Sequence, residues 1–178
     1  MINAIGDSLV YGYGVGSENS FINIPHEKVN NYGINGDTSA GVLYRLDEVL
    51  DGQIIIILVG VNDFLNGISV DSTTSNIKKI LDEIFCRGKK ALLCIPFLLS
   101  EEEDYTRILS LANDKITKYR ENLLQFSHED LLIVDFYGEL QKEPNYSHLF
   151  FDGIHPTKST HDLMRSLLIK SMEERKWI

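Results

Sequence analysis

Four short clusters of polar residues contain the side-chain types that acyl transfer requires. They are Gly6-Asp7-Ser8, Asn35-Gly36-Asp37-Thr38, Gly60-Val61-Asn62-Asp63 and Asp152-Gly153-Ile154-His155-Pro156. Acyl transfer needs a hydroxyl nucleophile, a base within hydrogen-bond reach, a group that orients the base, and donors for the oxyanion. Ser8 supplies the hydroxyl, and His155 is the side chain in these clusters that can take and return a proton near neutral pH. This pair is therefore the candidate nucleophile and base.

The remaining roles have candidates in the same clusters. Asp152 precedes His155 in the last cluster, so either its carboxylate or the backbone carbonyl at 152 could accept from the second imidazole nitrogen. Three groups could donate to the oxyanion: the backbone N–H groups of Ser8 and Gly36 and the side-chain amide of Asn62. Loss of one such donor typically lowers the rate by about 10²–10³-fold. The predicted site comprises Ser8, Asp152 and His155 with this oxyanion hole.

The spacing of apolar residues predicts strands that alternate with helices. Strand-length apolar runs occupy residues 2–5, 29–34, 54–59, 91–95 and 131–134. Helical stripes run through residues 42–50, 77–85, 108–126 and 163–172. Strands with little polar alternation are buried on both faces, and strands that alternate with helices pair in parallel. The fold class is therefore α/β, a three-layer α/β/α sandwich with about five parallel strands.

This fold would bring the four clusters to one edge of the sheet. Three clusters follow the first three predicted strands, and the fourth lies between the fifth strand and the last helix. In an open parallel sheet, ligands bind outside the carboxyl ends of the strands, at the point where the strand order reverses. We therefore expect the four clusters to converge there.

Length and composition exclude several classes of function. The 178 residues suit one domain, residues 1–178. Lys and Arg total 17 against 26 Asp and Glu, and the net charge of −9 argues against a nucleic-acid partner. The apolar runs are far shorter than the roughly 20 residues of a membrane span, and the amino terminus lacks the features of a signal peptide. We expect a cytoplasmic protein with two free core cysteines, Cys86 and Cys94.

A second serine could be mistaken for the nucleophile. Residues 37–41, Asp-Thr-Ser-Ala-Gly, approach the nucleophile elbow of α/β-hydrolases, but Asp37 stands where the elbow needs its first glycine. We therefore expect Ser39 to be a cap or first-turn residue of a helix, with Asp37 and Thr38 as capping residues.

Several other features have a structural interpretation. The glycine-rich segment 12–16 lacks the last glycine of a dinucleotide-binding loop. The other histidines, at positions 26, 128, 148 and 161, have no metal-ligand spacing, so neither metal nor cofactor is predicted. Four aromatic residues near the predicted site could line an acyl pocket or pack in the core or at the surface: Tyr11, Tyr13, Phe64 and Phe97.

Together the clusters resemble the sequence blocks of the SGNH (GDSL-type) hydrolase family. The blocks are matched, in the family's order, by Gly6-Asp7-Ser8-Leu9, Gly36, Gly60-Val61-Asn62-Asp63 and Asp152-Gly153-Ile154-His155. The second and last clusters look most like the branch of small bacterial thioesterases, lysophospholipases and arylesterases. The resemblance implies a flavodoxin-like sheet, Ser-His-Asp hydrolysis without metal or cofactor, and a small-molecule ester or thioester as substrate.

The chain differs from this pattern in its first crossover. Only residues 9–35 separate Ser8 from Gly36, and they include Pro25 and little helical periodicity, so a shortened crossover is expected. Typical members of the branch are also exported, whereas no signal peptide is expected here. Two alternative functions are a carbohydrate O-acetylesterase on the same fold and a non-catalytic, flavodoxin-like module that binds a phosphate or nucleotide.

Overall fold

A five-stranded parallel sheet forms the centre of the protein. A computed structural model describes residues 1–102 and 106–178. The strands are β1 (Ile2–Gly6), β2 (Val29–Gly33), β3 (Ile54–Leu58), β4 (Lys90–Ile95) and β5 (Leu131–Asp135). Every residue of β1 and β3 is buried, as expected for apolar strands covered on both faces. The predicted parallel sheet is confirmed.

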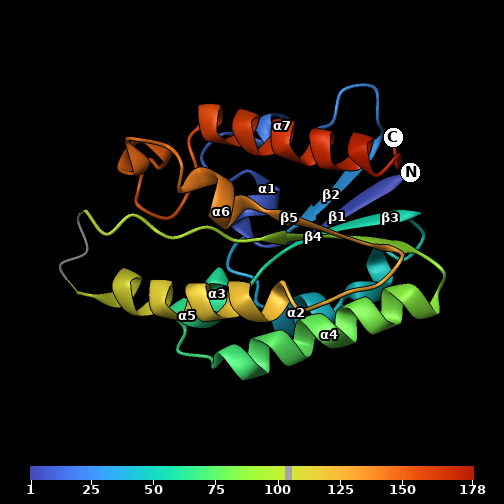
Figure 1. The fold of residues 1–178 in the computed structure, drawn as a ribbon, viewed down its shortest axis with the longest axis horizontal. Helices are drawn as coiled ribbons and strands as arrows, with labels where there is room; N and C mark the ends of the chain where they lie inside the picture. The colour runs from blue at the N-terminus through green and yellow to red at the C-terminus, as the bar shows by residue number, and fades with distance from the viewer. Residues whose placement is uncertain (103–105) are drawn as a thin grey trace.

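Helices cover both faces of this sheet, so the predicted three layers are confirmed (Figure 1). One layer contains α2 (Ser39–Tyr44), α3 (Val61–Leu65), α4 (Val70–Cys86) and α5 (Ile108–Leu123). The other contains α1 (Ser8–Tyr11), α6 (Phe136–Leu140) and α7 (Lys158–Glu174). Short 3₁₀ helices occupy η1 (Ser17–Asn19), η2 (Leu46–Glu48) and η3 (Tyr146–Leu149). Within the described residues, no helix combines the length and apolar character needed to cross a membrane.

The strand order is β2-β1-β3-β4-β5, which is the flavodoxin-like order. The chain passes from β1 to β2 on one side and then returns to β3 on the other. The strand order therefore reverses between β1 and β3, where Gly6 pairs with Leu58 at the carboxyl ends. The segments that follow these two strands, α1 and α3, begin the predicted site.

Local structure departs from the sequence prediction in two places and agrees with it in a third. The stripe at residues 42–50 is divided between α2 and η2, because apolar residues spaced by three or four positions fit a 3₁₀ turn as well as an α-helix. The crossover between β1 and β2 contains only α1 and η1, in agreement with the expected shortening. Cys94 is buried and free, but the prediction of a core position for Cys86 is wrong: this free thiol is exposed at the end of α4.

The aromatic residues near the predicted site divide into two groups. Phe64 and Phe97 are 4% and 0% exposed and belong to the core. Tyr11 and Tyr13 are each 44% exposed. Phe97 therefore packs in the core, whereas Phe64 packs in the core and also borders an apolar hollow of about 390 Å³. The two tyrosines lie at the surface.

Candidate active site

Ser8 is the first residue of α1, two positions after Gly6 ends β1. Asp7 caps this helix: its carboxylate accepts a hydrogen bond of 2.9 Å from the backbone N–H of Leu9. The Ser8 side chain is directed to the rim of the sheet, where its Oγ lies 3.0 Å from Nε2 of His155. The candidate nucleophile and base are thus in hydrogen-bond contact, although 147 positions separate them in the chain.

His155 lies on a loop that a short backbone bridge closes. Phe150 and Pro156 form an isolated antiparallel bridge, and the backbone N–H of Phe151 donates to the carbonyl of His155 at 3.1 Å. Within the loop, Nδ1 of His155 lies 2.6 Å from Oδ2 of Asp152. The Asp152 side chain, not its backbone carbonyl, therefore orients the imidazole. Since an ionised carboxylate only accepts hydrogen bonds, Nδ1 carries the proton and Nε2 can accept from the Ser8 hydroxyl.

The Asp152 carboxylate is held ionised by its neighbours. Partial burial alone would raise its pKa, but hydrogen bonds from the backbone N–H and the ring of His155 and from the backbone N–H of Ile154 lower the pKa below the ordinary value of 3.8. The two backbone bonds measure 2.7 Å from His155 and 2.9 Å from Ile154, and both end on Oδ1. This arrangement leaves Oδ2 for the imidazole.

The predicted oxyanion donors lie in loops on the same rim. Gly36 is exposed and has a φ of +79°, a conformation that favours glycine, and open space surrounds the position where a Cβ would be. Asn62, in the first turn of α3, donates one amide hydrogen to the carbonyl of Asp37 at 3.0 Å. Among the hydrogen bonds of the described residues, none uses the backbone N–H of Ser8 or Gly36. These two N–H groups and the second Asn62 hydrogen can serve a ligand.

An ion pair beneath this rim was not predicted. Arg45 and Asp37 form a 2.7 Å ion pair in which the side chains are 9% and 11% exposed. The Arg45 guanidinium also donates to the carbonyl of Tyr32 at 2.8 Å and to that of Gly6 at 3.0 Å. Arg45 therefore ties the ends of β1 and β2 to the loop that carries Gly36. One basic residue at the end of a helix gives no signal of such a role in the sequence.

Ser39 and its neighbours are structural, as predicted. Ser39 is fully buried in the first turn of α2, where its hydroxyl donates to Asp63 and its backbone N–H donates to the same carboxylate at 2.8 Å. Thr38 is the N-cap and accepts from the backbone N–H of Gly41. Asp37, expected to share the capping, instead pairs with Arg45, although it also accepts from the backbone N–H of Thr38. The rival nucleophile is therefore buried and bonded to a carboxylate, and no imidazole is among its hydrogen-bond partners in the described residues.

The carboxyl group of Asp7 lies in the core directly behind the nucleophile. It is fully buried, and its Oδ2 has no hydrogen-bond partner among the described residues. Burial, assisted by the negative charges of Asp37 and Asp63 and opposed by the Leu9 hydrogen bond, raises the pKa of Asp7 from 3.8 to about 7. Asp7 is therefore about half protonated in the folded protein at neutral pH and largely protonated below it.

This elevated pKa predicts a pH-dependent gain in stability for Asp7→Asn. Between about pH 4 and pH 7, Asp7 is more protonated in the folded state than in the unfolded state. The free energy of unfolding of the wild type therefore decreases as the pH rises through this range. Asparagine stays neutral and keeps an acceptor for Leu9. We expect the free energy of unfolding of Asp7→Asn, relative to wild type, to rise by at least about 1 kcal/mol from pH 5 to pH 8. Urea unfolding at the two pH values measures this change, and a constant difference would contradict it.

The remaining histidines are structural or lie at the surface, as predicted. His161 is buried, accepts from the backbone N–H of Phe21 at 3.2 Å, and has its pKa lowered by burial to about 4. His128 stacks on Phe85 with ring centroids 3.9 Å apart. Within residues 1–102 and 106–178, no group of three or more His, Cys, Asp or Glu side chains has a metal-binding arrangement.

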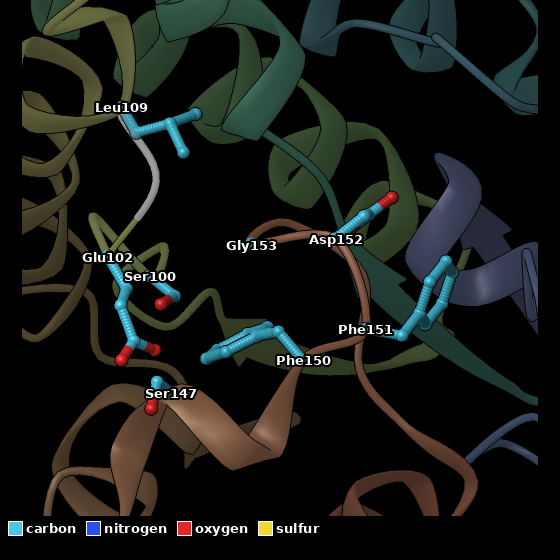
Figure 2. A pocket seen from close by; sticks show the side chains of 8 residues that line it. All are labelled: Ser100, Glu102, Leu109, Ser147, Phe150, Phe151, Asp152 and Gly153. Atoms are coloured by element: carbon cyan, nitrogen blue, oxygen red, sulfur yellow. The ribbon is translucent and has the colours of Figure 1, made fainter. Parts of the chain in front are cut away.

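A pocket of about 290 Å³ adjoins the site on the Asp152 side (Figure 2). The loop residues Phe150 and Asp152 line one wall. Ser100, Glu102 and Ser147 also line the pocket and supply hydroxyl and carboxylate groups. Figure 2 shows the Phe150 ring beside the pocket and the Phe151 ring directed away from it.

A hydroxyl, an imidazole and a carboxylate linked in this order form the arrangement that serine hydrolases use. The strand order is flavodoxin-like, and the site lies at the carboxyl ends of the strands, where open parallel sheets bind ligands. The chain belongs to the GDSL-like Lipase/Acylhydrolase family, whose sequence model matches residues 4–163. The predicted family is therefore confirmed.

Individual proteins resemble this chain in structure or in sequence. TesA has a similar structure, with a TM-score of 0.73, 22% identity and 98% of both chains covered. A catalytic mutant of the acetylxylan esterase Axe2 from Geobacillus stearothermophilus gives a TM-score of 0.68 and 18% identity, with 96% of this chain and 93% of that chain covered. The N-acylneuraminate cytidylyltransferase of Streptococcus agalactiae serotype III (strain NEM316) is 29% identical over 150 residues. That match covers 82% of this chain, which spans about a third of the relative's length (35%).

Proposed function

We propose that this protein hydrolyses carboxylic esters or thioesters of small molecules through a covalent acyl-enzyme intermediate. The observation that carries the proposal is the hydrogen-bonded series Ser8–His155–Asp152, with contacts of 3.0 and 2.6 Å. We propose that residues 1–178 act as one catalytic domain. A cytoplasmic location stays a prediction; both cysteines are free, as is usual in a reducing compartment.

In the first half-reaction, Ser8 Oγ attacks the acyl carbon while its proton passes to Nε2 of His155. The Asp152 carboxylate stabilises the imidazolium that forms, and the oxyanion accepts from the backbone N–H groups of Ser8 and Gly36 and from the Asn62 amide. The bond to the leaving group then breaks, and His155 returns the proton to the departing alcohol or thiol. Water repeats these steps on the acyl-enzyme, releasing the acid and restoring the Ser8 hydroxyl.

The surroundings of the site suit an acyl group on one side. A second hollow of about 390 Å³ is lined largely by apolar residues, among them Leu65, Ile108 and Leu111. Leu65 follows Asn62 by three residues in α3, so the hollow begins on the oxyanion side of the site. An apolar hollow there supports acyl esters, lysophospholipid-like esters, aryl esters and thioesters as the substrate class.

Active-site labelling tests the proposal directly. A fluorophosphonate probe should label the protein, and the modified peptide should contain Ser8. Ser8→Ala should abolish both labelling and hydrolysis of p-nitrophenyl acetate, because no hydroxyl remains to form the covalent bond. Ser17→Ala serves as the matched control, since this exposed serine lies in the same N-terminal segment.

Two outcomes would refute the proposal. One is a folded wild-type protein that neither takes up the probe nor cleaves p-nitrophenyl acetate, octanoate or an acyl thioester. The other is labelling that persists in Ser8→Ala. If nucleotides then stabilised wild type and Ser8→Ala equally against heat, the non-catalytic binding module would be the better interpretation.

A carbohydrate O-acetylesterase is the second candidate function. It is favoured by the pocket beside Asp152, where Ser100, Ser147 and Glu102 could bond sugar hydroxyl groups. The names of two similar proteins refer to carbohydrates: the acetylxylan esterase and the N-acylneuraminate cytidylyltransferase. Release of acetate from acetylated xylan or O-acetylated N-acylneuraminate would favour this candidate if it exceeded the rate on p-nitrophenyl octanoate at equal concentration.

A further inference from the structure

Three aromatic rings meet beside the proposed nucleophile. The ring centroids of Tyr13 and His155 lie 4.5 Å apart, and those of Phe151 and His155 lie 5.8 Å apart. Tyr13 and Phe151 are in turn 6.3 Å apart. We call Tyr13, Phe151 and His155 the aromatic cluster. Tyr13 and Phe151 remain 44% and 50% exposed, so burial in the core does not account for their position.

The glycine-rich segment 12–16 brings Tyr13 to this cluster. The backbone N–H groups of Gly12 and Tyr13 both donate to the carbonyl of Ser8 at 3.0 Å, and Gly16 donates back to Gly12 at 2.9 Å. Tyr13 is therefore bonded through its backbone to Ser8, while its ring contacts His155. A single residue thus links the two members of the proposed catalytic pair.

Gly14 allows the second ring to pack against the same segment. Its φ is +80°, and a Cβ at this position would lie 2.2 Å from Cζ of Phe151. The Phe151 ring therefore rests directly on the backbone of residue 14 and points away from the pocket of Figure 2. The absence of a side chain at Gly14 therefore leaves the space that the Phe151 ring occupies.

The imidazole needs such a contact because its hydrogen bonds do not fix its tilt. The bonds to Asp152 and Ser8 lie at the ring edge, and both tolerate rotation about the line that joins the two partners. His155 also lies on a loop, and sites on loops depend on surrounding packing for their precision. The Tyr13 ring, whose centroid lies 4.5 Å from that of the imidazole, opposes this rotation.

We propose that Tyr13 is a positioning residue, which holds the His155 imidazole in the plane where Nε2 meets the Ser8 hydroxyl. This role rests on the proposed function. The aromatic ring is the part that matters, because the Tyr13 hydroxyl makes no hydrogen bond among the described residues. Tyr13 acts on catalysis through His155 and does not itself exchange a proton.

Substitutions at position 13 test this role. Tyr13→Leu should lower kcat for p-nitrophenyl acetate by roughly 10–100-fold, because a displacement of about 1 Å at a reacting group can cost this much. KM should change less than about threefold, since this small ester does not depend on the ring for binding. Tyr13→Phe should keep a kcat within about threefold of wild type. Tyr11→Leu is the matched control, because Tyr11 is equally exposed and has no ring contact with His155 within the described residues.

A second variant perturbs the cluster from the other side. Gly14→Ala forces the Phe151 ring to move and should lower kcat by a smaller factor than Tyr13→Leu. Thermal unfolding identifies variants whose folded state is lost. The role is refuted if folded Tyr13→Leu keeps the wild-type kcat, if Tyr11→Leu loses as much, or if Tyr13→Phe fails to restore activity. A wild type that is neither labelled nor active would refute the proposed function itself, whereas these results refute only the role of Tyr13.

Discussion

Replacing His155 with alanine is expected to lower kcat for p-nitrophenyl acetate by on the order of 10⁴–10⁶-fold. The Ser8 hydroxyl would lose its acceptor, Nε2 of His155, which lies 3.0 Å away. Among the described residues, no other side chain that could take its proton is hydrogen-bonded to the Ser8 hydroxyl. The leaving group would also lose its proton donor. Initial rates over a range of substrate concentrations measure the loss, which should fall on kcat and not on KM.

His148→Ala is the matched control for this prediction. His148 is exposed on η3, in the same C-terminal region as His155. The His148→Ala variant should keep full activity. The double variant Ser8→Ala/His155→Ala should be no slower than either single variant, because residues that act as a unit give non-additive losses. Activity above about a tenth of wild type in His155→Ala would remove the imidazole from the mechanism.

Arg45→Met is expected to reduce the free energy of unfolding by about 3–5 kcal/mol. Methionine preserves much of the side-chain volume but leaves the nearly buried Asp37 carboxylate without its cation. The carbonyl groups of Tyr32 and Gly6 also lose a donor. Guanidinium-chloride unfolding would measure the loss. Because Asp37 lies beside Gly36, the variant should also lower kcat under conditions where it remains folded.

Two further variants separate this effect from the loss of an ordinary charge. Arg87→Met removes a guanidinium that is 52% exposed and pairs with Glu83 and Asp47, and it should change stability by less than about 1 kcal/mol. Adding Asp37→Asn to Arg45→Met should recover part of the stability by removing the unpaired charge. Equal effects of Arg45→Met and Arg87→Met would contradict the interpretation of a buried pair.

The sequence predicted the sheet well because its strands carry an unusually clear signal. Ile54 to Leu58 are five consecutive apolar residues, and all of them are buried. The long helices were equally readable from their repeating apolar faces, as at Ile77, Ile80 and Ile84. Helices α1, α3 and α6 were not predicted, since elements of four or five residues are too short to display a period.

The candidate site was predictable to the extent that its residues lie next to strand ends. Ser8 and Asn62 follow β1 and β3, so parallel pairing alone brings their segments to one edge. The contact between Ser8 and His155 joins residues 147 positions apart, and its distance depends on packing. The contacts of Arg45 and Tyr13 could not be predicted from the residues next to them in the sequence, because long-range contacts leave no local pattern.

The bridge between Phe150 and Pro156 has a consequence for assembly of the protein. Asp152 and His155 belong to the same closed loop, so the contact between their side chains spans only three positions of the chain. Ser8 comes from the opposite end of the chain, and it meets that loop only when the C-terminal segment docks beside α1. Ester turnover would therefore require the docked loop. A chain with every strand paired but this loop undocked would not cleave an ester substrate.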